Sequence, residues 1–137
     1  MKEIKDLFRI IKKERLNEEN IGGVLQSLSH KMTSIYFPII FCNDGFHFSM
    51  QASSTHYSEP RKNIVDFYDA VEIGFPSETE ELLHGSLIQD NDIFYYIKIE
   101  IVYDIIKKHG GIDIEKTFKD YKSYIIENKL KDIMGKK

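Results

Sequence analysis

The chain of 137 residues contains one cysteine, no tryptophan and only three prolines. The single thiol of Cys42 cannot form an internal disulfide, which argues against the cross-linked framework of a small secreted protein. No segment approaches the run of about 18 apolar residues that a membrane span needs, and the first residues mix charges instead of forming a signal peptide. We therefore expect a soluble, cytoplasmic protein without a membrane partner.

Neither sign of charge dominates the sequence. The 19 basic and 22 acidic residues give a formal net charge of −3, without a long block of one sign. This balance gives no support for electrostatic attraction to nucleic acid. With 42% hydrophobic and 30% charged residues the composition is that of a globular protein. The length predicts one domain over residues 1–137.

The motifs of the common catalytic and metal sites are absent from the sequence as well. The two Gly-Gly pairs lack the spacing and the following Lys-Ser/Thr of a phosphate-binding loop. There is no cysteine pair, no His-Glu-x-x-His segment, no Asp-rich calcium loop and no Gly-x-Ser-x-Gly elbow. We predict neither a metal nor a cofactor, and a binding function is favoured over an enzymatic one.

Helices are predicted toward both ends of the chain. An amphipathic pattern begins at Ile4, and Gly22-Gly23 predicts a turn before a second short helix over residues 24–31. Residues 101–108 predict a further helix that Gly110-Gly111 ends. A terminal helix then places four apolar residues on one face: Ile114, Phe118, Tyr121 and Ile125. This face would cover the domain's own core, and it would also suit an interface in a homo-oligomer.

The strongest local signal is a β-hairpin over residues 36–51, centred on Asp44-Gly45. A two-residue loop there pairs Phe41 with Phe48 and Cys42 with His47. It also places six apolar side chains on the core face: Phe37, Ile39, Phe41, Phe46, Phe48 and Met50. A longer loop would change these pairs but would leave the polar row of the second strand on the opposite face: His47, Ser49 and Gln51.

Two further strands and a short helix complete the expected fold. Residues 69–75 alternate, with Val71, Ile73 and Phe75 on one face, and residues 93–99 are rich in β-branched and aromatic side chains. Ser77 can cap a short helix between these strands. The fold class is therefore α+β: a mainly antiparallel sheet of about four strands over residues 36–112, flanked by helical regions at 1–31 and 113–137.

The segment from Gln51 to Arg61 concentrates polar and aromatic side chains at the exit of the hairpin, where binding groups gather on loops. Arg61 is one of three arginines beside 16 lysines, and its planar guanidinium matches carboxylates and phosphates. We expect Tyr57 to stack on a ligand or partner and Arg61 to bind an anion. Gln51 and Ser53 would orient the bound group. The predicted binding residues are Gln51, Ser53, His56, Tyr57, Arg61 and Glu72.

A structural role for this segment is the competing interpretation. Arg61 would then form an ion pair with Glu72 or Asp69, and the serines and threonines would satisfy their own backbone. A catalytic alternative is a small hydrolase or transferase that uses His56 or His47 as a general base.

Cys42 and His109 are two further residues whose side chains could take part in catalysis. Cys42 beside His47 would form a thiolate dyad, although a lone cysteine among aromatic residues is usually buried and inert. For His109 the sequence favours a structural role, in contact with the terminal carbonyls of the preceding helix.

Several segments resemble a pattern of small uncharacterised phage and prophage proteins. They are residues 44–53, 56–61 and 71–77, with weaker support from 96–102 and 109–112, so that the resemblance covers roughly residues 36–112. The chain departs from the pattern at Ser58, where a cysteine is frequent, and at Lys98, where a proline is frequent. The resemblance implies a phage accessory protein in the host cytoplasm. Such a protein would inhibit a host protein, host defence included, or sequester a small nucleotide-like, anionic ligand.

Overall fold

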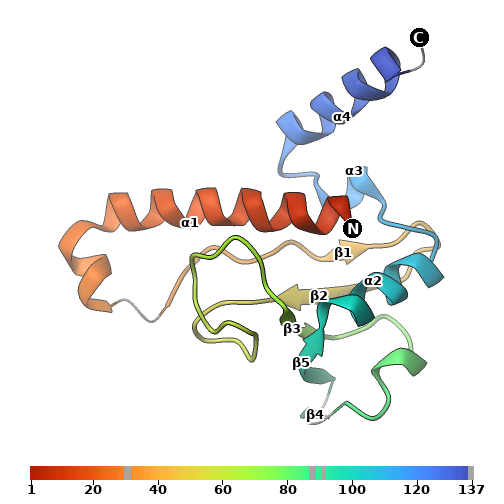
Figure 1. Cartoon of the computed structure of the whole chain (residues 1–137), viewed down its shortest axis with the longest axis horizontal. Coiled ribbons are helices and arrows are strands. Elements are labelled where there is room, and N and C mark those ends of the chain that lie inside the picture. Colours follow the sequence, from red (N-terminus) through yellow and green to blue (C-terminus); the bar gives the residue numbers. More distant parts are fainter. Residues whose placement is uncertain (30–31, 87–88, 91, 136–137) are drawn as a thin grey trace.

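The computed structural model describes residues 1–29, 32–86, 89–90 and 92–135, and it confirms the α+β class (Figure 1). Five strands form an antiparallel sheet in the order β1-β2-β3-β5-β4. The strands are β1 Ile40–Phe41, β2 His47–Gln51, β3 Ala70–Gly74, β4 Gln89–Asp90 and β5 Ile93–Lys98. The helices are α1 Lys2–Ser29, the 3₁₀ turn η1 Glu81–Leu83, α2 Ile99–Lys108, α3 Ile114–Thr117 and α4 Lys122–Gly135.

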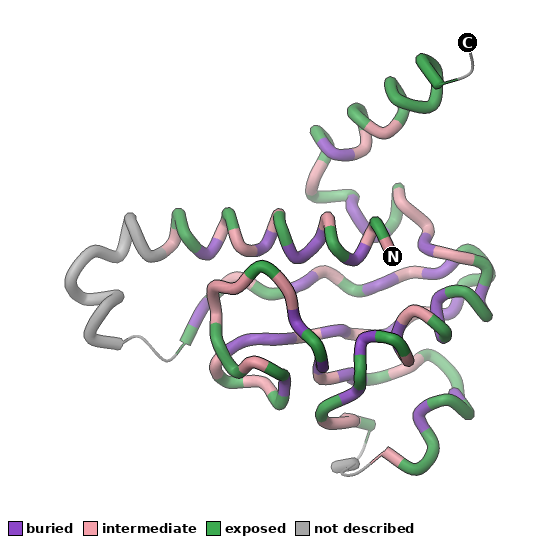
Figure 2. Tube along the Cα trace, in the orientation of Figure 1, coloured by how far each residue is buried: buried purple, intermediate pink, exposed green. Residues whose placement is uncertain are grey.

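The hydrophobic core lies between the sheet and the helices α1 and α2. The predicted apolar stripe of α1 is almost completely buried, at Ile4, Leu7, Phe8 and Ile11. Val102, Ile105 and Ile106 of α2 belong to the same cluster as the inward side chains of β2 and β3. Figure 2 shows this burial along the side of α1 that faces the sheet, whereas most of α4 is exposed.

The hairpin is present, but its loop is one residue longer than predicted. Phe41 pairs with His47, and the Cys42 N–H donates to Phe46 O at 2.8 Å, so the loop is Asn43-Asp44-Gly45. Gly45 has a φ of 96°, which fits the left-handed residue of a three-residue loop. Because side chains alternate along a strand, this shift inverts the faces of the first strand.

The inverted strand corrects the predicted core. Ile40 and Cys42 are buried, whereas Ile39 is exposed and Phe41 is half-buried. The pairing of Cys42 with His47 is therefore wrong. The faces of β2 are as predicted: Phe48 and Met50 are buried, and the polar row is not.

Two predicted helix boundaries are also wrong. Helix α1 continues through Gly22-Gly23. Each glycine destabilises a helix by roughly 1 kcal/mol relative to alanine. This cost does not end α1, because the core holds the first half of the helix. Residues 30–31 of the predicted second helix lie outside the described residues. The terminal helix is instead divided into α3 and α4. The division lets Tyr124 stack on the buried Phe118, with ring centroids 4.1 Å apart, a contact that residues six apart on one straight helix cannot make.

The region between β3 and β5 differs from the prediction in four details. Phe75 is exposed, because the strand ends at Gly74 and Phe75 turns away with a φ of 51°. Ser77 pairs with the backbone of His47 instead of capping a helix. The short turn η1 begins later, where the Glu80 carboxylate accepts from the Leu82 N–H at 3.0 Å. The two-residue strand β4 was not predicted.

The guanidinium of Arg15 connects four parts of the fold. Its side chain lies on α1 at 1% exposure and donates to the carbonyl oxygens of Ile35, Ala52 and Asn63 at distances of 2.8–3.1 Å. It also donates to the Tyr68 hydroxyl at 3.0 Å. Burial lowers the pKa of Arg15, but an arginine stays protonated in proteins, so its charge is balanced by carbonyl dipoles.

We expect Arg15→Met to lower the free energy of unfolding by about 3 kcal/mol or more, because the substitution leaves several buried carbonyl groups without a donor. The control is Arg9→Met on the same helix, where the side chain is 65% exposed and a change below about 0.5 kcal/mol is expected. Urea unfolding followed by circular dichroism measures both values. Equal effects of the two substitutions would contradict the role given to Arg15.

Candidate functional site

The predicted binding segment forms a loop whose two ends are tied together at its base. Arg15 binds Ala52 O at 2.9 Å and Asn63 O at 3.0 Å, which are the first and last residues of the loop. The Asn63 side chain accepts a hydrogen bond from the Ser54 N–H at 2.9 Å. The loop is thus held on the sheet by contacts that lie far apart in the sequence.

Several polar side chains of this region have structural partners. The Gln51 side-chain amide satisfies the backbone of Phe37: its oxygen accepts from the Phe37 N–H and its nitrogen donates to Phe37 O, both at 3.0 Å. Ser53 and Ser58 are completely buried, and the Ser58 hydroxyl donates to Pro60 O at 3.1 Å. These hydrogen bonds agree with the structural interpretation of the serines in the segment.

A surface group of aromatic and cationic side chains remains, in which Tyr95 is half-buried and the others are exposed. We call it the tyrosine–arginine cluster: Tyr57, Arg61, Tyr95 and Tyr96. Tyr57 stacks on Tyr95 with ring centroids 4.2 Å apart and contacts the edge of Tyr96 at 5.8 Å. The Arg61 guanidinium lies 4.9 Å from the centre of the Tyr57 ring. Tyr57 and Tyr96 are 38% and 37% exposed. Among the described residues Arg61 forms no ion pair with Glu72 or Asp69.

A β-bulge positions the two tyrosines of β5. Val71 pairs with Ile97 and Ile73 pairs with Phe94, so the single residue Glu72 lies opposite both Tyr95 and Tyr96. Tyr96 has a φ of 54°, a left-handed conformation that costs a bulky residue about 1–2 kcal/mol. Its N–H donates to Tyr57 O at 3.2 Å, which connects the bulge to the loop. Bulges and strained residues of this kind are concentrated next to functional sites.

His56 and Glu72 lie behind the cluster. The His56 Nδ1 is 2.6 Å from the Ser53 hydroxyl, and its Nε2 is 3.9 Å from a Glu72 carboxylate oxygen. Burial, with Arg15 and Arg61 nearby, lowers the pKa of His56. Burial also raises the pKa of Glu72, although the Tyr57 N–H and Arg61 oppose this shift. Because each shift disfavours the charged form, the two residues do not behave as a strong ion pair.

The Ser53–His56–Glu72 arrangement resembles a hydrolytic triad only in residue types. Ser53 is completely buried, and its hydroxyl oxygen also accepts from the Thr55 N–H at 3.1 Å. A nucleophile needs access to a substrate carbonyl, which this oxygen lacks. The arrangement therefore serves to hold the loop.

Cys42 and His47 do not form the dyad that the predicted register would give. Cys42 is buried, and its backbone forms an isolated antiparallel β-bridge with Ile112. His47 lies against Phe41, with ring centroids 5.3 Å apart. Burial, with a smaller contribution from Asp44, raises the pKa of the Cys42 thiol to about 11. The thiolate that a nucleophile requires is therefore scarce at neutral pH.

His109 lies at the end of α2, as predicted, and its backbone N–H donates to the terminal carbonyls of Ile105 and Ile106. Its ring contacts carboxylates and not the helix carbonyls. Its Nδ1 lies 2.6 Å from Asp44 and its Nε2 lies 2.7 Å from Glu80, while the ring stacks on Phe46. Burial alone would lower the pKa of His109, but the hydrogen bonds to Glu80 and Asp44 raise it. The imidazolium joins the hairpin loop, η1 and the end of α2.

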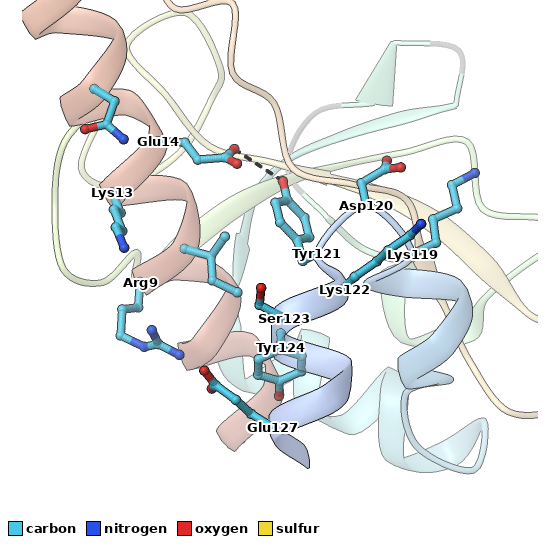
Figure 3. Close-up of a pocket in the computed structure, with 12 residues that line it drawn as sticks. Arg9, Lys13, Glu14, Lys119, Asp120, Tyr121, Lys122, Ser123, Tyr124 and Glu127 are labelled. Atoms are coloured by element: carbon cyan, nitrogen blue, oxygen red, sulfur yellow. Dashed lines mark hydrogen bonds between the residues drawn. The ribbon is translucent and has the colours of Figure 1, made fainter. Parts of the chain in front are cut away.

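A separate hollow of about 710 Å³ lies between α1 and the beginning of α4 (Figure 3). Its walls carry charges of both signs, including Arg9, Lys13 and Glu127. Glu14 points toward Tyr121, whose hydroxyl is 3.5 Å from the carboxylate. None of the predicted binding residues lines this hollow.

Comparisons with protein-family models, with curated proteins and with solved structures found no match for this chain. In the part of the chain that the structure describes, no group of three or more His, Cys, Asp or Glu side chains is arranged so that it could hold a metal ion. None of its described helices combines the length and the apolar character that crossing a membrane requires.

Tyr95 and Tyr96 are not among the binding residues that the sequence predicts. Their place in a strand is confirmed, but the bulge at which Tyr96 becomes exposed depends on the pairing of β5 with β3. The available signal was the Tyr-Tyr pair itself, because one of two neighbouring side chains in a strand must leave the core face.

We expect the Cys42 thiol of the folded protein to react with a disulfide reagent about a hundredfold more slowly than the unfolded chain, because a pKa of about 11 and burial both deplete the accessible thiolate. Spectrophotometric titration at neutral pH, with and without urea, measures the two rates. Rapid labelling of the folded protein would contradict this assignment.

The raised pKa of His109 predicts a pH dependence of stability. The stabilisation by His109 is complete below the unfolded pKa near 6.5 and is lost as the pH rises through the higher pKa of the folded state. His109→Gln should cost about 2 kcal/mol at pH about 6, where the charged hydrogen bonds are intact.

Urea unfolding between about pH 6 and pH 9 tests this prediction, with the exposed His84→Gln as the matched control. Wild type and His84→Gln should lose stability over this range, whereas His109→Gln should lack that loss. The same pH dependence in all three proteins would refute the assignment.

Proposed function

We propose that this protein is a non-enzymatic binding protein that docks a partner protein on its tyrosine–arginine cluster. The observation that carries the proposal is the exposed cluster itself, built around a strained bulge at Tyr96 and a fixed loop. Tyrosine and arginine are enriched among the residues that dominate binding energy at protein interfaces.

The chemistry of Arg61 indicates what the partner presents. Its guanidinium lies over the Tyr57 ring, and among the described residues it donates one hydrogen bond, to Ser54 O at a long 3.4 Å. The remaining donors suit a carboxylate, which a planar guanidinium binds with two parallel hydrogen bonds. We therefore propose an acidic group next to an apolar patch on the partner's surface.

The rigidity of the cluster supports a binding role. The loop that carries Tyr57 and Arg61 is closed by Arg15 and Asn63, and Tyr57 is held between the stacked Tyr95 and the backbone of Tyr96. A surface that is ordered before binding loses less conformational entropy on association. The phage resemblance suggests a host protein as the partner, encountered in the cytoplasm of the host cell.

The hydrolase or transferase alternative has less support. As a general base His56 would need a reacting group within reach, but its Nδ1 is engaged with the buried Ser53 and its Nε2 faces Glu72. A neutral imidazole between these groups orders the loop behind the cluster.

Native mass spectrometry after incubation with a bacterial cell extract tests the proposal, using wild type, Arg61→Ala and the control Lys62→Ala. Lys62 is an exposed neighbouring cation outside the cluster. We expect wild type and Lys62→Ala to form the same complex with one protein. Arg61→Ala should bind this protein at least tenfold more weakly, because a tenfold change in affinity corresponds to about 1.4 kcal/mol, the contribution of a single interface contact. The captured protein is then purified and the binding is repeated with the two pure components.

A small-molecule adduct that Arg61→Ala loses would replace the protein partner with an anionic ligand of measured mass. Binding that is equal in all three proteins, or no complex with the folded wild type, would refute the proposal. Turnover of a captured ligand that His56→Ala abolishes, with binding retained, would establish the enzymatic alternative.

A further inference from the structure

Helix α4 has apolar side chains on two opposite faces. The inner face docks on the protein through Tyr124, whose ring stacks on Phe118 and whose hydroxyl donates to Asp6 at 2.8 Å. The opposite face carries four side chains that are between 53% and 69% exposed, which we call the outer stripe: Ile126, Leu130, Ile133 and Met134. At 100° per residue these positions lie within about one third of the helix circumference.

The outer stripe is not covered by any described part of the chain. Figure 1 shows α4 pointing away from the sheet and from α1, and Figure 2 shows that most of its length is exposed. A surface helix that only covered its own core would carry polar residues on this side. The stripe is therefore an unpartnered apolar face.

We propose that the outer stripe pairs with the same stripe of a second copy of this chain, forming a two-fold dimer through parallel α4 helices. Ile126, Leu130 and Ile133 follow the four-three spacing of a coiled-coil seam. This inference goes beyond the proposed function and does not rest on it.

The charges beside the stripe favour a parallel arrangement. Lys122 and Lys129 flank one side of the seam and Glu127 flanks the other, at the positions that contact the neighbouring helix in a coiled coil. Lys129 pairs with Glu115 of its own chain at 3.0 Å, whereas Lys122 and Glu127 are exposed. A parallel pair places Lys122 of each copy beside Glu127 of the second copy, which gives two equivalent ion pairs. An antiparallel pair would bring the two lysine flanks together.

The attachment of α4 to its own domain is compatible with this dimer. The body of the protein contacts the inner face around Tyr124, and α3 contacts the helix through the ion pair of Glu115 with Lys129 at 3.0 Å. The side chains of the outer stripe stay exposed. Pairing through the stripe therefore places the two domains on opposite sides of the helix pair. The same patch is used on both copies, as two-fold symmetry requires.

Sedimentation equilibrium of the full chain tests the dimer. We expect wild type to dimerise in a concentration-dependent way. Leu130→Glu should weaken association at least tenfold, because it buries a charge in the seam. The control is Lys131→Glu, which changes an exposed residue of the same helix outside the stripe and should leave association unchanged. Circular dichroism verifies that the variants keep their helix content.

A charge exchange tests the orientation. Lys122→Glu alone and Glu127→Lys alone should each weaken the dimer, and the double variant should restore it, since each exchanged pair is again of opposite sign. Failure of the double variant to restore association would refute the parallel arrangement.

A wild type that stays monomeric at all concentrations, or a Leu130→Glu variant that associates like wild type, would refute the dimer. A trimer or tetramer would refute the two-fold arrangement. Because none of these substitutions touches the tyrosine–arginine cluster, loss of the dimer with partner binding intact separates this inference from the proposed function.

Discussion

The buried guanidinium of Arg15 is the interaction on which the rest of the structure depends. Removing a charge from water is costly. Among the described residues Arg15 forms no ion pair at contact distance, and of the carboxylates only that of the nearby Glu18 favours its charged form from further away. The cost is offset by hydrogen bonds to backbone carbonyls of three separate segments, at Ile35, Ala52 and Asn63, and to the Tyr68 hydroxyl. Because Arg15 donates to all of these groups, α1, the end of β2 and the loop base are fixed together.

This arrangement links the fold to the candidate site. Arg15 and Asn63 close the loop base, and the closed loop holds Tyr57 against the bulge of β5. The serines and Gln51 satisfy backbone groups inside the molecule, as their hydrogen bonds show. The side chains of the site that face the solvent are therefore the tyrosine rings and the Arg61 guanidinium of the tyrosine–arginine cluster. The strain at Tyr96 is maintained by the surrounding contacts, as is usual where a bulge redirects side chains.

The hairpin shows how a correct local prediction can give wrong contacts. Asp44-Gly45 fits both a two-residue and a three-residue loop, because each needs a residue with positive φ near the turn. The sequence period of a strand is two residues, so the longer loop exchanged the inner and outer faces of the first strand. Cys42 moved into the core and Phe41 moved beside His47. The second strand kept its predicted faces because its alternation does not depend on the loop.

The sequence alone determined the α+β class, the positions of the main strands, the buried stripe of α1 and the glycine end of α2, because these follow from periodicity and local backbone preferences. It also placed Tyr57 and Arg61 together in one candidate binding loop. Only the tertiary structure decided the hairpin register, the division of the terminal helix and the partners of Arg15. It also placed Tyr95 and Tyr96 opposite Glu72. These features depend on contacts between residues that are distant in the chain, for which local sequence patterns carry no signal.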